Sequence, residues 1–319
     1  MPRVIPGGLI LAIVATFSGP VRAGDSPEEK ALAYLAREVP RWSAENRCFS
    51  CHNNGDAARA LYEAVRLGRP IKAEATADTD RWLARPEGWE KNGGDGPFSD
   101  KALARLQFAS ALASAVESGR VRDRDALALA ATRLADDQAD DGSWKVDDQD
   151  RVGSPATYGR PLGTWIARET LRIADRDRFF APIDRADAWL RRLPIANILD
   201  ASTVLLAKAY DDPAGGLERR TRALDLLRQG QSPEGGWGPF ATSPPEAFDT
   251  ALALLALDGH RDRPGVAGMI ARGRSFLVDA QQPDGSWAET TRPAGAESYA
   301  QRLSTTGWAT LALLKVKVP

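Results

Sequence analysis

The chain has 319 residues, of which 43% are hydrophobic and 27% charged, and its formal net charge is −1. This balance is typical of a globular protein, and a net charge near zero without a long run of one sign argues against a nucleic-acid-binding protein. After the first 23 residues, no apolar stretch is long enough to cross a bilayer, so we expect no stable membrane span in the mature chain.

The first 23 residues have the organisation of a signal peptide. Arg3 supplies a positive start, residues 9–17 form a short apolar core, and Val21 and Ala23 place small residues at a cleavage site. The core is shorter than the roughly 17 residues that span a bilayer, although an uncleaved anchor is the alternative. We therefore expect an exported, periplasmic protein whose single domain covers residues 24–319.

The chain has only two cysteines, Cys48 and Cys51, and they stand with His52 in the pattern C-x-x-C-H. This pattern is the attachment signature of a c-type haem, in which two thiols add to the vinyl groups of one haem and the adjacent imidazole binds the iron. Bacteria attach this haem outside the inner membrane, which agrees with a signal peptide. We therefore expect one covalent haem c on Cys48 and Cys51, with His52 as an axial ligand.

Two other uses of these residues stay open. A zinc site made of Cys48, Cys51 and His52 would need a fourth ligand, such as a carboxylate or a water molecule. In an oxidising compartment the two cysteines can instead form a disulfide.

A repeat follows further along the chain. The pattern Q-x-x-[DE]-G-x-W occurs at residues 138–144, 231–237 and 281–287, so the second and third copies start 50 residues apart. The first and second start 93 residues apart, close to two such periods. One period before the first copy lies a degenerate (worn) copy at residues 85–89. One period before that copy lies C-x-x-C-H. Self-similarity at this spacing predicts a repeat architecture.

Each repeat loop lies between two helices of different character. The preceding helix is amphipathic, as in residues 223–227 and 274–278, whereas the following helix is apolar almost all round, as in residues 250–257 and 306–314. The first kind is typical of an outer helix and the second of a helix buried on most faces. In the loop, Gly permits a tight turn, the acidic residue is a candidate helix cap, and Trp packs between the helices with an N–H that needs a partner.

Counted along the chain, this pattern predicts six helix pairs and no strand of useful length. The pairs cover residues 28–68, 77–118, 125–175, 182–210, 217–258 and 265–316. Tandem helix pairs can form an open superhelix or close into a ring, and repetition alone does not decide between the two.

The three Q-x-x-[DE]-G-x-W segments, with the Ala- and Leu-rich helices that follow them, resemble the QW repeats of the squalene–hopene cyclase and prenyltransferase β-subunit superfamily (terpenoid cyclase-like). The resemblance covers most of the mature chain, strongly after residue 125 and faintly before it. It implies an all-α fold, an α/α toroid with six inner helices ringed by six outer ones. It also implies a central cavity that can hold an apolar small molecule.

The reactive residues of that superfamily do not accompany the repeats. The sequence has no D-x-D-D, the motif whose acid protonates the substrate of a triterpene cyclase. Residues 136–140 match the letters D-D-x-x-D of a diphosphate-binding magnesium site, but they overlap a repeat loop, where capping and solvation explain the acids. Both cysteines belong to C-x-x-C-H, so the zinc site of the prenyltransferases is missing as well.

The second face of the haem iron has few conventional ligands in this chain. His260 follows the second helix of unit five, which places it at the opposite end of the ring from C-x-x-C-H. Met269 is the candidate sixth ligand, although the repeat frame puts it about 18 Å from that rim at 1.5 Å per residue, and helix packing is the alternative role. Four residues are unusual further candidates: Lys91, Lys145, Tyr34 and Tyr158. We therefore expect a haem without a strong sixth ligand from the protein.

These patterns predict an exported c-type haem protein on a toroid scaffold, in electron transfer, redox chemistry or ligand binding, with a periplasmic redox partner or an apolar small molecule. The alternatives are a terpenoid cyclase or prenyltransferase-like enzyme without the usual acid, and an interaction scaffold. The sequence identifies no catalytic residue of such an enzyme.

Overall fold

A computed structural model describes residues 26–92, 101–146, 152–209, 216–290, 292 and 298–317. The predicted signal peptide, residues 1–23, lies outside the described residues, so its prediction stays open. Within the described ranges, none of the helices combines the length and the apolar character that crossing a bilayer requires.

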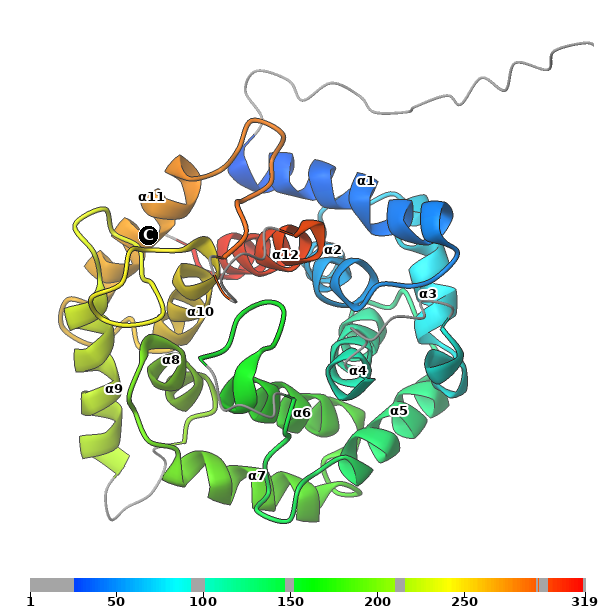
Figure 1. Cartoon of the computed structure of the whole chain (residues 1–319), viewed down its shortest axis with the longest axis horizontal. Coiled ribbons are helices and arrows are strands. Elements are labelled where there is room, and N and C mark those ends of the chain that lie inside the picture. Colours follow the sequence, from blue (N-terminus) through cyan, green and yellow to red (C-terminus); the bar gives the residue numbers. More distant parts are fainter. Residues whose placement is uncertain are drawn as a thin grey trace, which may run out of the picture.

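The described residues form twelve α-helices in two concentric rings, which confirms the predicted all-α, α/α-toroid fold (Figure 1). The outer helices are α1 (Pro27–Asn46), α3 (Ala77–Leu83), α5 (Arg124–Asp136), α7 (Phe180–Arg192), α9 (Gly216–Gly230) and α11 (Val266–Asp279). The inner helices are α2 (Ala58–Arg66), α4 (Lys101–Glu117), α6 (Gly159–Asp175), α8 (Ile198–Leu206), α10 (Ala247–Asp258) and α12 (Tyr299–Lys315). Each outer helix is followed by an inner one, so the six predicted pairs are confirmed.

Burial separates the two kinds of helix as their sequences predict. The inner helix α12 is buried at every position from Leu303 to Leu314, whereas the interior of the outer helix α9 buries one stripe that includes Ala223, Leu224 and Leu227. An apolar helix can lose its contact with water on all sides only inside the ring, and an amphipathic one suits the outside.

The three Q-x-x-[DE]-G-x-W loops make the same contacts. In each, the Trp indole N–H donates to the carbonyl ten residues earlier on the outer helix, at 2.7, 2.6 and 2.7 Å for Trp144, Trp237 and Trp287. The backbone N–H of each Trp donates to a Thr hydroxyl of the next inner helix. A buried indole with its N–H paired stabilises the corner between the two helices, so the predicted role of the Trp is confirmed.

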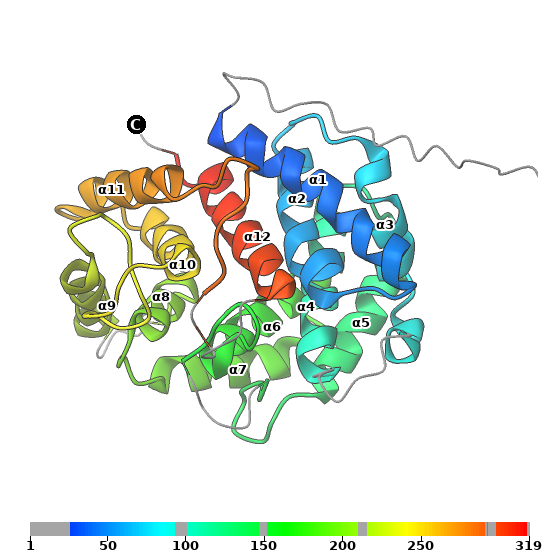
Figure 2. The ribbon, with the colours of Figure 1, turned by 45° about the horizontal axis from the view of Figure 1, so that its top comes forward.

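The Gln of each loop links one unit to the next. The Nε2 group of Gln138 donates to Pro182 O at 2.8 Å, and that of Gln231 donates to Met269 O at 2.9 Å. In the last unit, Gln281 Nε2 donates to Pro27 O at 2.9 Å, back on the first helix. The repeat therefore closes on itself, and α12 lies beside α1 and α2 in both views (Figures 1 and 2).

The acidic residue of the loop caps the turn rather than a helix. Asp141 Oδ1 accepts the backbone N–H of Ser143 at 3.1 Å, and Asp284 Oδ1 accepts that of Ser286 at 3.0 Å. The inner helix α6 has Tyr158 as its N-cap residue, and no side chain caps its first turn. The predicted helix cap is therefore wrong, because a carboxylate two residues before the N–H closes an Asx turn within the loop itself.

The worn copy at residues 85–89 has a different geometry. It lies in a 3-10 helix, η3 (Pro86–Lys91), and Trp89 donates its indole N–H to Trp82 O at 3.1 Å, only seven residues earlier. The preceding outer helix α3 has seven residues, and a 3-10 turn, η2 (Ala73–Ala75), comes before it. The second unit thus keeps the Trp and loses the loop.

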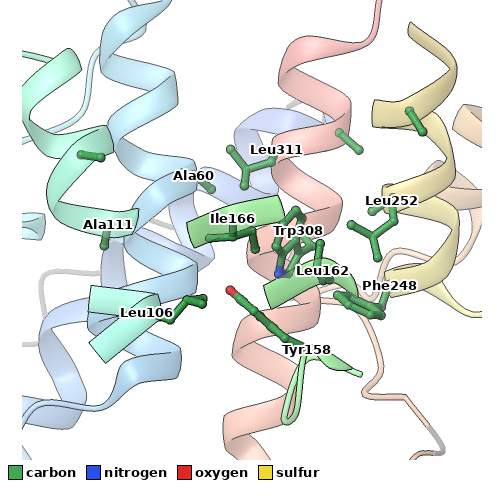
Figure 3. Close-up of a cluster of buried hydrophobic side chains, with 14 of the residues drawn as sticks. Ala60, Leu106, Ala111, Tyr158, Leu162, Ile166, Phe248, Leu252, Trp308 and Leu311 are labelled. Atoms are coloured by element: carbon green, nitrogen blue, oxygen red, sulfur yellow. The ribbon is translucent and has the colours of Figure 1, made fainter. Parts of the chain in front are cut away.

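The ring's own side chains fill the part of its centre shown in Figure 3. Tyr158 and Phe248 both pack edge-on against Trp308 at 6.0 Å between ring centroids, and all three are buried. Leu162 and Leu252 pack around them.

Two cavities lie outside that cluster. One of about 550 Å³ opens between α1 and α12 beside Tyr34, Glu38 and Arg302. The other, of about 510 Å³, lies at the ends of α6, α7 and α8 and is lined by residues that include Arg168 and Lys208.

Candidate functional site

The C-x-x-C-H segment connects α1 to α2, which is the position predicted for it in the first unit. It is not wholly a loop as predicted, because Cys51–Ala57 forms a π-helix, η1, that continues directly into α2. The Ser50 side chain caps this helix by accepting the backbone N–H groups of His52 and Asn53 at 3.1 and 3.4 Å. π-Helical turns are rare and occur frequently at functional sites.

The two residues between the cysteines are held in place. Two hydrogen bonds join Phe49 to Asn92. The backbone N–H of Phe49 donates to Asn92 Oδ1 at 2.8 Å, and Asn92 Nδ2 donates to the backbone carbonyl of Phe49 at 2.6 Å. Its ring stacks on Trp82 with 4.5 Å between centroids and 4° between planes. The side chains of Cys48 and Cys51 therefore project from a fixed segment.

Neither cysteine is part of a disulfide and both are half-buried, so the disulfide alternative is not formed in this structure. In the described ranges, no group of three or more His, Cys, Asp or Glu side chains converges to hold a metal ion. The zinc alternative for Cys48, Cys51 and His52 therefore has no support from the arrangement of these side chains.

The His52 ring contacts the last inner helix. Its Nδ1 lies 2.8 Å from Ser304 Oγ, and Ser304 Oγ donates its hydrogen to Asp56 Oδ2 at 2.7 Å. A serine hydroxyl has one hydrogen, so His52 must be the donor in the first contact and its proton must be on Nδ1. This tautomer leaves the lone pair on Nε2. Burial lowers the pKa of His52 to about 4, so the imidazole is neutral at pH 7.

Asp56 is the centre of a buried polar network. Gln107 Nε2 donates to its Oδ2 at 2.8 Å, and the Tyr158 hydroxyl donates to its Oδ1. The Arg59 guanidinium lies 3.8 Å from the same Oδ1. Burial raises the pKa of Asp56 to about 6, while the charge of Arg59 and the donated hydrogen bonds limit the rise.

Several buried polar atoms around this network lack a hydrogen-bond partner among the residues that the structure describes. These are Nε and Nη1 of Arg59, Oε1 of Gln107 and Nε1 of Trp308, and Arg59 also stacks on the Trp308 ring at 4.8 Å. In Figure 3 the Trp308 nitrogen and the Tyr158 hydroxyl lie on the same side of the cluster. Buried polar groups of this kind pair with water or a small polar molecule.

Sequence reasoning missed most of this network. Asp56, Arg59, Gln107 and Ser304 carried no functional prediction, and Tyr158 was considered only as an unusual iron ligand. The one available signal was the spacing of His52 and Asp56, because residues four apart share a helix face.

The other candidate ligands lie elsewhere. Met269 is buried in the outer helix α11, where its carbonyl accepts Gln231 Nε2, and the structure does not bring it together with His52 on η1. Met269 as the sixth ligand therefore stays a prediction. His260 is buried just after α10, and burial together with the charge of Arg220 lowers its pKa.

The D-D-x-x-D letters at residues 136–140 have a structural explanation. Arg105 forms a two-pronged ion pair with Asp137, at 2.7 Å from Nε and 2.8 Å from Nη2. This contact joins α4 to the end of α5, so Asp137 has a structural role through an ion pair rather than through the predicted capping or solvation.

Comparison with known proteins finds partial sequence matches to terpene cyclases. No family model matches the chain. Over 125 residues it is 39% identical to a drimenyl diphosphate synthase of Streptomyces showdoensis, which covers 37% of the chain and 23% of that enzyme. Over 176 residues it is 27% identical to the lanosterol synthase of Saccharomyces cerevisiae, covering 52% of the chain and 22% of that enzyme. The matched segments thus span less than a quarter of either relative.

Solved structures extend the likeness to the whole ring. The type II terpene cyclase MstE from Scytonema, without ligand, aligns with 89% of this chain and 97% of its own at a TM-score of 0.54 and 15% identity. A variant of that enzyme in complex with its substrate, geranylgeranyl dihydroxybenzoate, aligns at a TM-score of 0.57 and 13% identity, with 91% of this chain and 98% of its own covered. The chain therefore has a terpene cyclase-like fold.

Proposed function

We propose that this chain is an exported protein that uses its terpene cyclase-like toroid as the scaffold for one covalently attached c-type haem, with a role in electron transfer, redox chemistry or ligand binding. The observation that carries the proposal is the state of His52. The hydrogen bond through Ser304 to Asp56 puts the proton on Nδ1 and leaves Nε2 free to bind iron.

The residues of the motif fit the group. Cys48 and Cys51 are half-buried thiols outside any disulfide, and they would form the two thioether bonds to the haem. His52 is neutral, as a metal ligand must be, and its second ring nitrogen donates a hydrogen bond as metal-bound histidines almost always do. When bound, the haem would supply one-electron chemistry or an iron that binds a small ligand.

The protein's own part in this site is to orient the side chains that would hold the haem. Ser304 and Asp56 fix the ring orientation and tautomer of His52, while Ser50 and Asn92 fix the segment that carries the thiols. His52 on the first unit contacts Ser304 on the sixth, so the site lies where the ring closes.

The optical spectrum of the purified protein tests the proposed iron coordination. We expect a high-spin spectrum with His52 as the one strong protein ligand, and we expect loss of that spectrum in His52→Ala. A His260→Ala variant and a Met269→Leu variant serve as controls and should leave the spectrum unchanged. A low-spin spectrum that either control abolishes would overturn the proposal of a haem without a strong sixth ligand.

A second candidate function is acid-catalysed cyclisation of an isoprenoid-like polyene. Asp56 favours it, because a carboxylic acid with a pKa near 6 inside the ring can keep its proton for transfer to an alkene. The partial matches to terpene cyclases also favour it. Incubation with squalene or geranylgeranyl diphosphate, followed by mass spectrometry of the extract, tests this candidate. A cyclised product that disappears in Asp56→Asn would support it, and the absence of product from the folded wild-type protein would reject it.

A further inference from the structure

We propose that Asp56 is the proton-accepting partner of the His52 site: when the haem iron gains an electron from a one-electron reductant, the Asp56 carboxylate binds a proton. This inference rests on the proposed haem attachment and assigns a role to a residue outside the C-x-x-C-H motif. The step balances, because one electron passes from the reductant to the iron, and one proton from a hydronium ion of the solvent forms an O–H bond with a carboxylate oxygen and leaves water.

The first support is a continuous chain of hydrogen bonds. His52 Nδ1 donates to Ser304 Oγ at 2.8 Å, and Ser304 Oγ donates to Asp56 Oδ2 at 2.7 Å. A change in the electron density of the imidazole therefore reaches Asp56 through one hydroxyl. Hydrogen bonds in a low-dielectric interior polarise one another, which strengthens this coupling.

The second support is the charge balance around Asp56. Four elements face it: Arg59 on α2, Gln107 on α4, Ser304 on α12, and Tyr158 at the start of α6. Among the residues that the structure describes, Arg59 is the permanent charge in this set, and His52 is the titratable group linked to Asp56 through Ser304. An electron added at the iron removes one positive charge from these surroundings, and a buried carboxylate then binds a proton more tightly.

The titration behaviour of the neighbours agrees with this assignment. Burial raises the pKa of Asp56 to about 6, within reach of neutral pH. Burial also raises the pKa of Tyr158 well above its ordinary value, so the tyrosine keeps its proton. Asp56 is therefore the group of this network that can exchange a proton near pH 6.

The third support is a set of buried polar atoms that water can satisfy. Among the described residues, Nε and Nη1 of Arg59, Oε1 of Gln107 and Nε1 of Trp308 are buried without a hydrogen-bond partner. Arg59 and Gln107 both contact Asp56 directly. Ordered water that satisfies these atoms would also carry the proton to the carboxylate.

The pH dependence of the midpoint potential tests the proposal, by spectroelectrochemistry of the haem-loaded protein between pH 5 and 8. For one electron coupled to one proton, the affinity for the electron falls up to tenfold per pH unit, which corresponds to about 59 mV. We expect a pH-dependent potential in the wild type and none in Asp56→Asn. Ser304→Ala, which removes the hydroxyl between the two groups, should at least halve the slope.

Asp249→Asn is the matched control. Asp249 is also a buried carboxyl on an inner helix, and burial raises its pKa to about 7, but it pairs with Arg292 at 3.0 Å and has no link to His52. This variant should keep the slope of the wild type. A wild-type slope that persists in Asp56→Asn and Ser304→Ala, or a wild-type potential independent of pH, would overturn the proposal. A wild-type protein without covalent haem would instead overturn the proposed function.

Discussion

Asp56 and His52 have opposite pKa shifts from one cause, since burial disfavours the charged form of both. For the carboxyl group the neutral form is the protonated one, so its pKa rises to about 6, and for the imidazole it is the deprotonated one, so its pKa falls to about 4. Between these values both groups are neutral. A neutral imidazole beside a protonated or singly charged acid is the state in which Nε2 can bind a metal.

The pH dependence of stability gives a first prediction. Asp56 stabilises the folded state relative to Asp56→Asn below its unfolded pKa of 3.8, and this contribution is lost as the pH rises through the folded value of about 6. The folded pKa of Asp56 lies about two above its unfolded value, a difference that corresponds to about 3 kcal/mol of unfolding free energy. The unfolding free energy of Asp56→Asn relative to the wild type, measured by denaturant unfolding of haem-free protein, should therefore rise by about 3 kcal/mol from pH 4 to pH 7.

His52 acts in the opposite direction in both the wild type and the variant, because stability from its neutral imidazole is lost as the pH falls from 6.5 towards 4. The difference between the variant and the wild type removes this contribution and isolates Asp56. A difference in unfolding free energy that stays constant from pH 4 to pH 7 would contradict the raised pKa.

Ser304 supplies a second prediction. Ser304→Ala leaves His52 Nδ1 and Asp56 Oδ2 each short of one partner inside the protein, so unfolding free energy should fall by about 1–3 kcal/mol. The control is Ser202→Ala on the inner helix α8, where the hydroxyl is buried and has no partner among the described residues. Equal unfolding midpoints for the two variants would show that the Ser304 contacts contribute nothing.

At this scale the sequence predicted the attachment motif and not its surroundings. Cys48, Cys51 and His52 are adjacent, so their spacing alone indicates their chemistry. Ser304 lies 252 residues from His52, and Tyr158 lies 102 residues from Asp56. Their contacts depend on how the ring closes, which no local pattern contains.

At the scale of the element, the repeat loop depends on its glycine. In the last copy, Gly285 has a φ of 94°, and a Cβ there would lie 2.3 Å from Lys30 O on the neighbouring helix α1. Left-handed backbone and close approach together explain why only glycine suits the position. The same geometry recurs at Gly142 and Gly235, with φ values of 94° and 95°.

Gly285→Ala is therefore the third prediction. The clash with backbone cannot be relieved by a side-chain movement, so we expect a loss of more than about 3 kcal/mol of unfolding free energy. Gly268→Ala in the outer helix α11 is the control, because the nearest atom to its Cβ would be a flexible Arg272 nitrogen at 3.7 Å. The control should be neutral or stabilising by up to about 1 kcal/mol. Comparable losses in both variants, measured by thermal or urea unfolding, would contradict this account.

Hydrophobic periodicity predicted the helix pairs, because an apolar helix and an amphipathic helix differ along their whole length. The same reasoning misassigned the loop acids as helix caps, since Asp141 and Asp284 cap turns. It also missed the π-helix after Ser50, because in a segment of only seven residues the wider π-helical turn does not change the spacing of apolar residues recognisably.

At the scale of the whole molecule, the ring is closed by contacts between the first and last units. Gln281 Nε2 donates to Pro27 O at 2.9 Å, and Arg274 pairs with Glu28 at 2.9 Å. His52 and Ser304 add a contact at the same seam. Repetition predicted six units without deciding between an open and a closed array, and the family resemblance supplied the closure that the structure confirms.

Gln281→Ala tests the closure as the fourth prediction. Removing the amide breaks the bond between the last loop and α1, so amide hydrogen exchange should accelerate most in α1 and in the 281–287 loop. Gln231→Ala, which breaks the equivalent bond between units five and six, is the control and should accelerate exchange around α11 instead. An identical exchange pattern in the two variants would contradict closure at the α1 seam.

The central claim is that the toroid has a covalent haem at C-x-x-C-H, and a pyridine haemochrome assay on the exported protein tests it most directly. Expressed with the haem-attachment machinery, the wild-type chain should retain one haem after acid extraction of unbound haem. The double variant Cys48→Ala/Cys51→Ala should retain none while its helical circular dichroism stays unchanged. A folded wild-type protein without extraction-resistant haem would contradict the account.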